Sequence, residues 1–272
     1  MHLFKVLKGK FSPVLLAFLA SVAVSFATRI FILLAGTHTG ISILQTSGLF
    51  LLGFLYDVGV AGVSVLLLLV YIWFQNNTIY QRKIVPWVVG LLLLMLGLLL
   101  FTNILPKDYN RQVHQALVIY LAVRVLIYVI LAFSPYRFRI IWRRLMLYFF
   151  VTVILFLLLL NAVSEWFFWQ EFSTRYNFIA VDNLIYTHEV IGNIVQSYHT
   201  YLIIGALVVI AIATTYLFYK PLYRSVIAPT SFTVRTGIAM AVIFVAATTL
   251  YIPEQWRHFS KNEYANELAG NG

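Results

Sequence analysis

Three charged residues lie inside long apolar stretches of the sequence: Arg29, Asp57 and Arg124. If these stretches are helices that cross a bilayer, a rise of about 1.5 Å per residue places Arg29 about 10 Å, and the other two about 12 Å, below the same surface. A charged side chain in hydrocarbon costs roughly 2.5–3.5 kcal/mol on insertion scales. Such residues therefore usually pair with one another or line a polar cavity.

Two interpretations of these charges stay open. In the first, Arg29 and Asp57 form a structural ion pair between neighbouring antiparallel helices, and Arg124 extends its side chain towards the interface. In the second, all three line a pocket with one excess positive charge that receives the phosphate of an anionic lipid from the outer leaflet. Arginine suits that role because its planar fork binds phosphate oxygens in pairs.

Few other residues could carry chemistry. The chain has no cysteine, which excludes disulfides, thiolate metal sites and iron–sulfur clusters. Every lysine and histidine lies outside the apolar stretches, so neither a helix-borne Schiff base nor a bis-histidine haem is expected. No phosphate-binding glycine loop occurs, and His188-Glu189 lacks the second histidine of a zinc-protease helix. The sequence therefore predicts no catalytic residue, metal or cofactor in this chain.

The elements that position the three charges are membrane helices. Of the 272 residues, 62% are hydrophobic and 10% are charged, whereas a soluble domain carries roughly 25% charge. The apolar runs have the length of about 20 residues that a helix needs to cross a bilayer core. We predict an all-α, polytopic helix bundle with seven spans: Ser12–Gly36, Leu49–Phe74, Pro86–Leu105, Ala116–Phe133, Leu145–Ser164, Tyr201–Tyr219 and Thr236–Ile252.

The basic residues predict the orientation of the bundle. With the N-terminus inside, twelve basic residues fall in cytoplasmic pieces and five in outer pieces, which is a positive-inside bias. The net charge of +10 therefore reflects topology, and no nucleic-acid partner is expected. The cytoplasmic residues are Lys5, Lys8, Lys10, Arg82, Lys83, Arg137, Arg139, Arg143, Arg144, Lys220, Arg224 and Arg235.

Two longer segments lie outside, a loop at 165–200 and a tail at 254–272. The loop begins with four aromatic residues at 166–169, as in the aromatic belt of a membrane interface. From about 177 to 198 its spacing predicts an interfacial amphipathic helix that either docks another protein part, contacts lipid or covers the bundle. The polar stripe of that helix consists of Asp182, Tyr186, Glu189, Asn193 and Gln196.

The outer loop resembles the lipoteichoic acid synthase family, which includes related phosphoglycerol transferases. The residues that carry the resemblance are Glu165–Phe172, Arg175–Asp182, Tyr186–Asn193 and Ser197-Tyr198, with weaker similarity at Leu55-Tyr56-Asp57 and in the tail from Asn262 to Gly272. Members of the family are usually described with five transmembrane helices. The resemblance thus allows a second description of the bundle, as the five transmembrane helices of the family with an inserted helix pair at 86–133.

The resemblance implies the N-terminal membrane domain of a phosphoglycerol or phosphoethanolamine transferase in the cytoplasmic membrane of a bacterium. In the family, a sulfatase-like domain of the alkaline phosphatase superfamily holds a threonine nucleophile and a divalent metal, typically manganese, magnesium or zinc. That domain would lie outside the cell and outside this chain, with residues 254–272 as the start of its linker. The membrane domain would anchor it and present a phospholipid headgroup to it.

Two alternatives come from other classes of protein. One is a standalone transporter or flippase with Arg29, Asp57 and Arg124 on its substrate path. The other is a membrane partner subunit without catalytic function.

Overall fold

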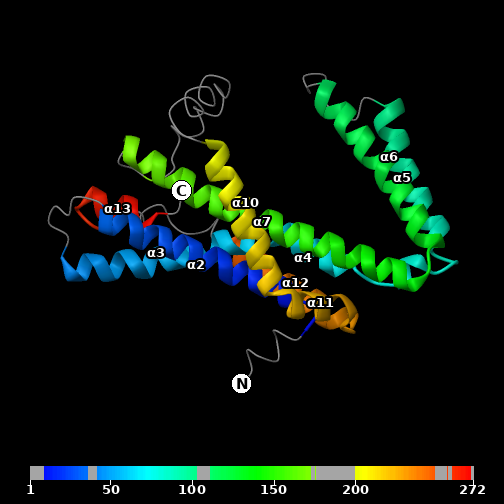
Figure 1. Ribbon diagram of the computed structural model, residues 1–272, viewed down its shortest axis with the longest axis horizontal. Coiled ribbons are helices and arrows are strands. Elements are labelled where there is room, and N and C mark those ends of the chain that lie inside the picture. Colours follow the sequence, from blue (N-terminus) through cyan, green and yellow to red (C-terminus); the bar gives the residue numbers. More distant parts are fainter. Residues whose placement is uncertain are drawn as a thin grey trace. The chain divides into compact units, whose positions relative to one another are not determined.

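The computed structural model describes residues 9–35, 42–102, 111–172, 175, 200–248, 256 and 259–270. Every regular element in these residues is a helix, which confirms the predicted all-α class (Figure 1). The helices are α2 (Ser12–Ala35), α3 (Ile43–Ser64), α4 (Leu66–Phe74), the 3-10 helix η1 (Thr78–Tyr80), α5 (Val85–Phe101), α6 (Arg111–Phe133), α7 (Tyr136–Phe172), α10 (Thr200–Leu217), α11 (Tyr219–Ile227), α12 (Phe232–Thr248) and α13 (Glu263–Ala269).

All seven predicted apolar segments are helical over nearly all of their described residues. Five of the described helices, α2, α3, α6, α7 and α10, are long and apolar enough to cross a membrane. The other two, α5 and α12, have 17 residues each, which is about the shortest length that spans a bilayer core. The chain is therefore a membrane protein built from helices.

The chain divides into two compact units. One consists of Phe74–Leu145 and contains η1, α5, α6 and the first residues of α7; the other consists of Met1–Trp73 and Met146–Gly272. The smaller unit contains the helix pair that the sequence marked as an insertion at 86–133. Within it, the ring Nε2 of His114 on α6 lies 2.8 Å from the Leu99 carbonyl on α5.

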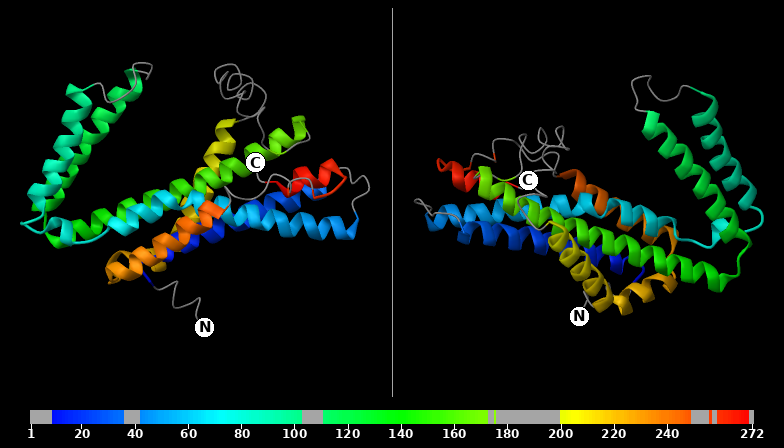
Figure 2. Two further views of the ribbon diagram at one scale, coloured as in Figure 1. Left: turned by 180° about the vertical axis from the view of Figure 1, so that it is seen from behind. Right: turned by 45° about the horizontal axis from the view of Figure 1, so that its top comes forward.

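In the larger unit, α2 and α3 lie side by side (Figure 2). The start of α3 is fixed by a capping box, in which Ser42 and Gln45 bond each other's backbone N–H. Near its other end, α3 meets α12, and a Cβ atom added at Gly62 would lie 3.0 Å from the backbone nitrogen of Ala246. Glycine at 62 therefore permits a close approach of the two helices.

Helix α7 is longer than predicted, with 37 residues in place of the span Leu145–Ser164. No glycine or proline interrupts the sequence from Tyr136 to Phe172, so the helix continues beyond the apolar run at both ends. Its first turns include basic residues that were predicted in a cytoplasmic loop. Its last turns include Glu165–Phe172, which were predicted to begin the outer loop. Helices α3, α6 and α12 also begin four to six residues earlier than predicted, so that α6 includes His114 and α12 includes Arg235.

The tail contains a helix that packs on the bundle. Asn262 caps α13, since its side-chain oxygen accepts a hydrogen bond from the Tyr264 backbone at 3.0 Å. Ala265, Leu268 and Ala269 are completely buried, and their spacing gives α13 one apolar face. The helix lies against α2 and α3 at the ends remote from Ser12 (Figure 2).

The predicted interfacial helix at about 177–198 lies outside the described residues. Its whole polar stripe, Asp182, Tyr186, Glu189, Asn193 and Gln196, therefore stays a prediction.

Candidate functional site

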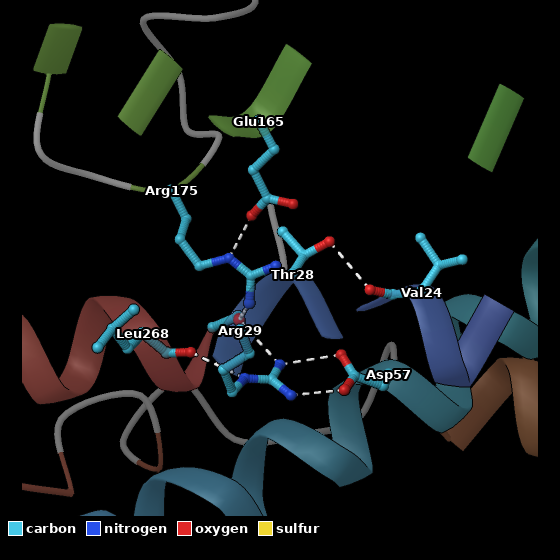
Figure 3. Close-up of polar contacts among 8 residues, drawn as sticks. Val24, Thr28, Arg29, Asp57, Glu165, Arg175 and Leu268 are labelled. Carbon is cyan, nitrogen blue, oxygen red and sulfur yellow. Dashed lines mark hydrogen bonds and ion pairs between the residues drawn. The ribbon is translucent and has the colours of Figure 1, made fainter. Parts of the chain in front are cut away.

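The two charges predicted to pair, Arg29 on α2 and Asp57 on α3, form a two-pronged ion pair (Figure 3). Arg29 Nη1 lies 2.5 Å from Asp57 Oδ2, and Nη2 lies 2.9 Å from Oδ1. Both side chains have an exposed fraction of 0%. Paired N–H···O bonds of this kind are among the strongest polar contacts in proteins.

A glycine makes room for this pair. Gly53 lies one helical turn before Asp57 on α3, and a Cβ atom there would overlap with Arg29 Cζ. Such a contact is far shorter than carbon atoms tolerate, so the guanidinium can lie across α3 only where the side chain is absent. The sequence analysis did not identify Gly53, although its position four residues before Asp57 places both on one face of the helix.

Arg29 also holds the C-terminal end of α13. Its Nε donates to the Leu268 carbonyl at 3.0 Å, and its Nη2 donates to the Gly270 carbonyl at 3.3 Å. Four hydrogen bonds therefore occupy a guanidinium that has five N–H groups. The last carbonyls of a helix have no partner within it, and an arginine is a favourable one.

A second buried arginine binds the same carbonyl. Arg175 Nε bonds a carboxylate oxygen of Glu165 on α7, and Arg175 Nη1 donates to the Gly270 carbonyl (Figure 3). Both side chains are almost completely buried. The sequence analysis counted Arg175 only as one of the five basic residues in the outer pieces. No spacing rule would have predicted its pairing with Glu165.

We call Arg29, Asp57, Glu165 and Arg175, with the carbonyls of Leu268 and Gly270, the α13 clamp. Its four ionised side chains carry two positive and two negative charges and are therefore balanced. The Arg29–Asp57 pair thus has the arrangement of the first interpretation, and the clamp lacks the excess positive charge of the predicted phosphate pocket.

Arg124, the third predicted charge, belongs to the smaller unit. Its side chain is exposed, and its guanidinium carbon lies 5.7 Å from the centre of the Tyr120 ring on the same helix. This arrangement matches a side chain that extends along an apolar helix surface.

Aromatic side chains cover the clamp. Trp169 is buried in a core that includes Ile32 and Leu268, and its ring meets that of Tyr264 edge to face at 5.6 Å. Burial raises the pKa of the Tyr264 hydroxyl. Phe168 and Trp169 are buried, and these two of the four predicted belt residues therefore form part of the packed core.

Three buried polar atoms around α13 have no hydrogen-bond partner among the described residues: Tyr56 Oη, Arg175 Nη2 and Tyr264 Oη. The described residues also contain no group of three histidine or acidic side chains that could hold a metal ion. Within the described residues, the clamp consists of two ion pairs and three hydrogen bonds from arginines to carbonyls.

No protein-family model, curated protein or solved structure matches this chain. The resemblance to the lipoteichoic acid synthase family therefore depends on the sequence motifs alone.

A double-mutant cycle tests the ion pair. We expect Arg29→Gln or Asp57→Asn alone to lower the free energy of unfolding by about 3–5 kcal/mol, because each change leaves a buried charge without its partner. The double variant should lose less than the sum of the two, with a coupling of roughly 1–3 kcal/mol. The measurement is SDS-induced unfolding of the detergent-solubilised chain. Strictly additive losses would contradict the pair, and Arg124→Gln, at an exposed site, should change stability by less than about 0.5 kcal/mol.

Proposed function

We propose that this chain is the membrane domain of a phosphoglycerol or phosphoethanolamine transferase of the lipoteichoic acid synthase type. In this proposal the helices anchor an extracytoplasmic catalytic domain that follows residue 272. The catalytic threonine and the divalent metal would belong to that domain. The membrane domain would hold it close to the phospholipid headgroups on which it acts.

The observation that supports an anchoring role is the α13 clamp. Helix α13 lies against α2 and α3, where two buried arginines bond the carbonyls at its C-terminal end. Upstream of α13, the Gln45 side chain at the start of α3 donates to the Ser260 hydroxyl at 2.8 Å. The segment is thus bound before and after its helix, which fixes the position of Gly270 on the bundle.

The clamp also changes how lipid presentation is proposed to work. Asp57 and the α13 carbonyls occupy four of the N–H groups of Arg29, so this residue is poorly placed to bind a headgroup phosphate. In this proposal the catalytic domain reaches the lipid headgroup because it is held at the membrane surface, without a headgroup contact from Arg29. The same saturation disfavours a transporter, because a substrate path through Arg29 and Asp57 would require α13 to leave and the pair to open.

The proposed orientation follows from the distribution of basic residues in the larger unit. The Ser12 hydroxyl donates to the Pro221 carbonyl at 3.2 Å, so the starts of α2 and α11 lie at the same end. Lys10, Lys220 and Arg224 lie in these segments, whereas α13 lies at the other end of α2. A cytoplasmic end with Lys10 and an outer end with α13 agree with the positive-inside rule.

Single cysteines in this cysteine-free chain test the orientation. We expect Lys261→Cys, next to α13, to react with a membrane-impermeant maleimide in intact cells. Lys220→Cys, at the start of α11, should react only after the cells are permeabilised. Both residues are exposed, so a difference in labelling reports their side of the membrane. Labelling of both in intact cells would contradict the orientation.

A two-substrate assay on the full-length protein tests the function. With its catalytic domain present, the protein should release diacylglycerol from phosphatidylglycerol or phosphatidylethanolamine in vesicles. Arg175→Gln should lower this transfer roughly tenfold or more, because loss of the clamp displaces the catalytic domain from the membrane. Hydrolysis of a small soluble phosphodiester should change by less than about twofold, because it requires only the nucleophile and metal.

The outcomes of this assay separate the function from the clamp. Absence of diacylglycerol release from both phospholipids, or a downstream reading frame without a sulfatase-like domain, would contradict the proposed function. An equal loss on both substrates would contradict the role of the clamp in positioning. Arg111→Gln, an exposed arginine at the start of α6, is the matched control and should leave both activities unchanged.

A further inference from the structure

The smaller unit has a strongly basic end. The residues around η1, the start of α5 and the start of α7 include six basic side chains: Arg82, Lys83, Arg137, Arg139, Arg143 and Arg144. The described residues of this unit, 74–102 and 111–145, contain no aspartate or glutamate. In the larger unit, by contrast, the buried arginines of the α13 clamp are each paired with a carboxylate.

Two of these arginines are held in place by an aromatic pair. The guanidinium carbon of Arg139 lies 5.0 Å, and that of Arg143 lies 5.6 Å, from the centre of the Tyr80 ring. Tyr80 stacks on Tyr128 with a centre-to-centre distance of 5.7 Å, and the Tyr128 hydroxyl donates to the Ile79 carbonyl at 2.5 Å. Contacts of this kind orient a guanidinium without neutralising its charge.

The remaining contacts give these two arginines different roles. Arg143 is buried and donates from Nη2 to the Asn76 carbonyl at 3.0 Å, which ties α7 to the segment before η1. Arg139 is half-buried, and its Nε is shielded from water without a hydrogen-bond partner among the described residues. Arg143 thus supports the site. The half-buried guanidinium of Arg139, held over the Tyr80 ring, has no carboxylate partner in the described part of this unit and can bind an anion from outside the chain.

A shallow, open apolar groove on α5 begins three residues after Lys83. It is lined by Pro86, Trp87, Gly90, Leu91 and Leu94. Nothing lies within 4 Å of the position of a Cβ atom at Gly90, and the indole of Trp87 is exposed. No residue of α5 is buried, so its apolar surface is available to lipid chains.

We propose that this basic end binds the phosphate of an anionic membrane phospholipid, with Arg139 as the principal ligand and the acyl chains along the α5 groove. Basic clusters of this size at the end of membrane helices suit anionic lipid headgroups. The predicted topology places them at the cytoplasmic leaflet, where the positive charges attract such lipids. The site goes beyond the proposed transferase function and does not depend on it.

Native mass spectrometry of the detergent-solubilised chain tests this site. We expect the chain to retain phosphatidylglycerol in preference to phosphatidylcholine, and Arg139→Gln to weaken retention of phosphatidylglycerol about fivefold or more. Arg139→Lys keeps the charge and should restore part of the binding. The matched control is Arg111→Gln, which removes the same charge at the start of α6, away from the basic end, and should leave retention unchanged.

Three outcomes would overturn the proposal. The first is equal retention of phosphatidylglycerol and phosphatidylcholine by the unmodified chain, a comparison that needs no variant. The second is an equal loss in Arg139→Gln and Arg111→Gln, which would indicate a general effect of net charge. The third is displacement of the lipid by equimolar inorganic phosphate, which would indicate a site for free phosphate.

Discussion

The larger unit depends on one constraint: the guanidinium of Arg29 is buried away from water and must be paired within the protein. Arg29 is completely buried, and an unpaired charge in such a place would cost several kcal/mol. The surrounding structure satisfies it from three directions: Asp57 supplies a carboxylate, Gly53 supplies space, and α13 supplies two carbonyl oxygens. Because the partners come from segments far apart in the chain, the charge also determines which segments meet.

The clamp joins elements that hydrophobic packing alone would hold weakly. In lipid, helices gain little from burying apolar surface against each other, and polar contacts contribute to their association. Helix α13 has only seven residues and would be unstable by itself. Its small apolar face and the two arginine bonds at its end give it a defined place on the bundle. This is why we interpret the cluster as an anchor for the chain beyond it.

The sequence predicted the elements of this structure better than their connections. Apolar runs identified the five described helices that are long enough to cross a membrane and two shorter ones. The cost of burying charge left two interpretations open, and the Arg29–Asp57 pair is the first of them. Hydropathy marks only the apolar part of α7. Its polar end turns are helical because they lack any helix-breaking residue, and a hydropathy pattern does not record this. The sequence analysis predicted a linker where α13 lies. The alanines that α13 buries are only weakly apolar, and the backbone carbonyls that hold it give no sequence signal. Hydrogen bonds to backbone carbonyls, such as that of Gly270, leave no signature in a sequence, because every residue has a carbonyl.

The central claim is that the buried Arg29 side chain holds α13 on the bundle, and amide hydrogen exchange in Gly53→Ala tests it most directly. The added methyl group should displace the guanidinium, while Gly205→Ala, at a position with no neighbour within 4 Å, controls for the gain in helix propensity. We predict that protection of residues 264–270 falls at least about tenfold in Gly53→Ala only, with α5 and α6 unchanged. Unchanged protection of 264–270 in Gly53→Ala would contradict the account.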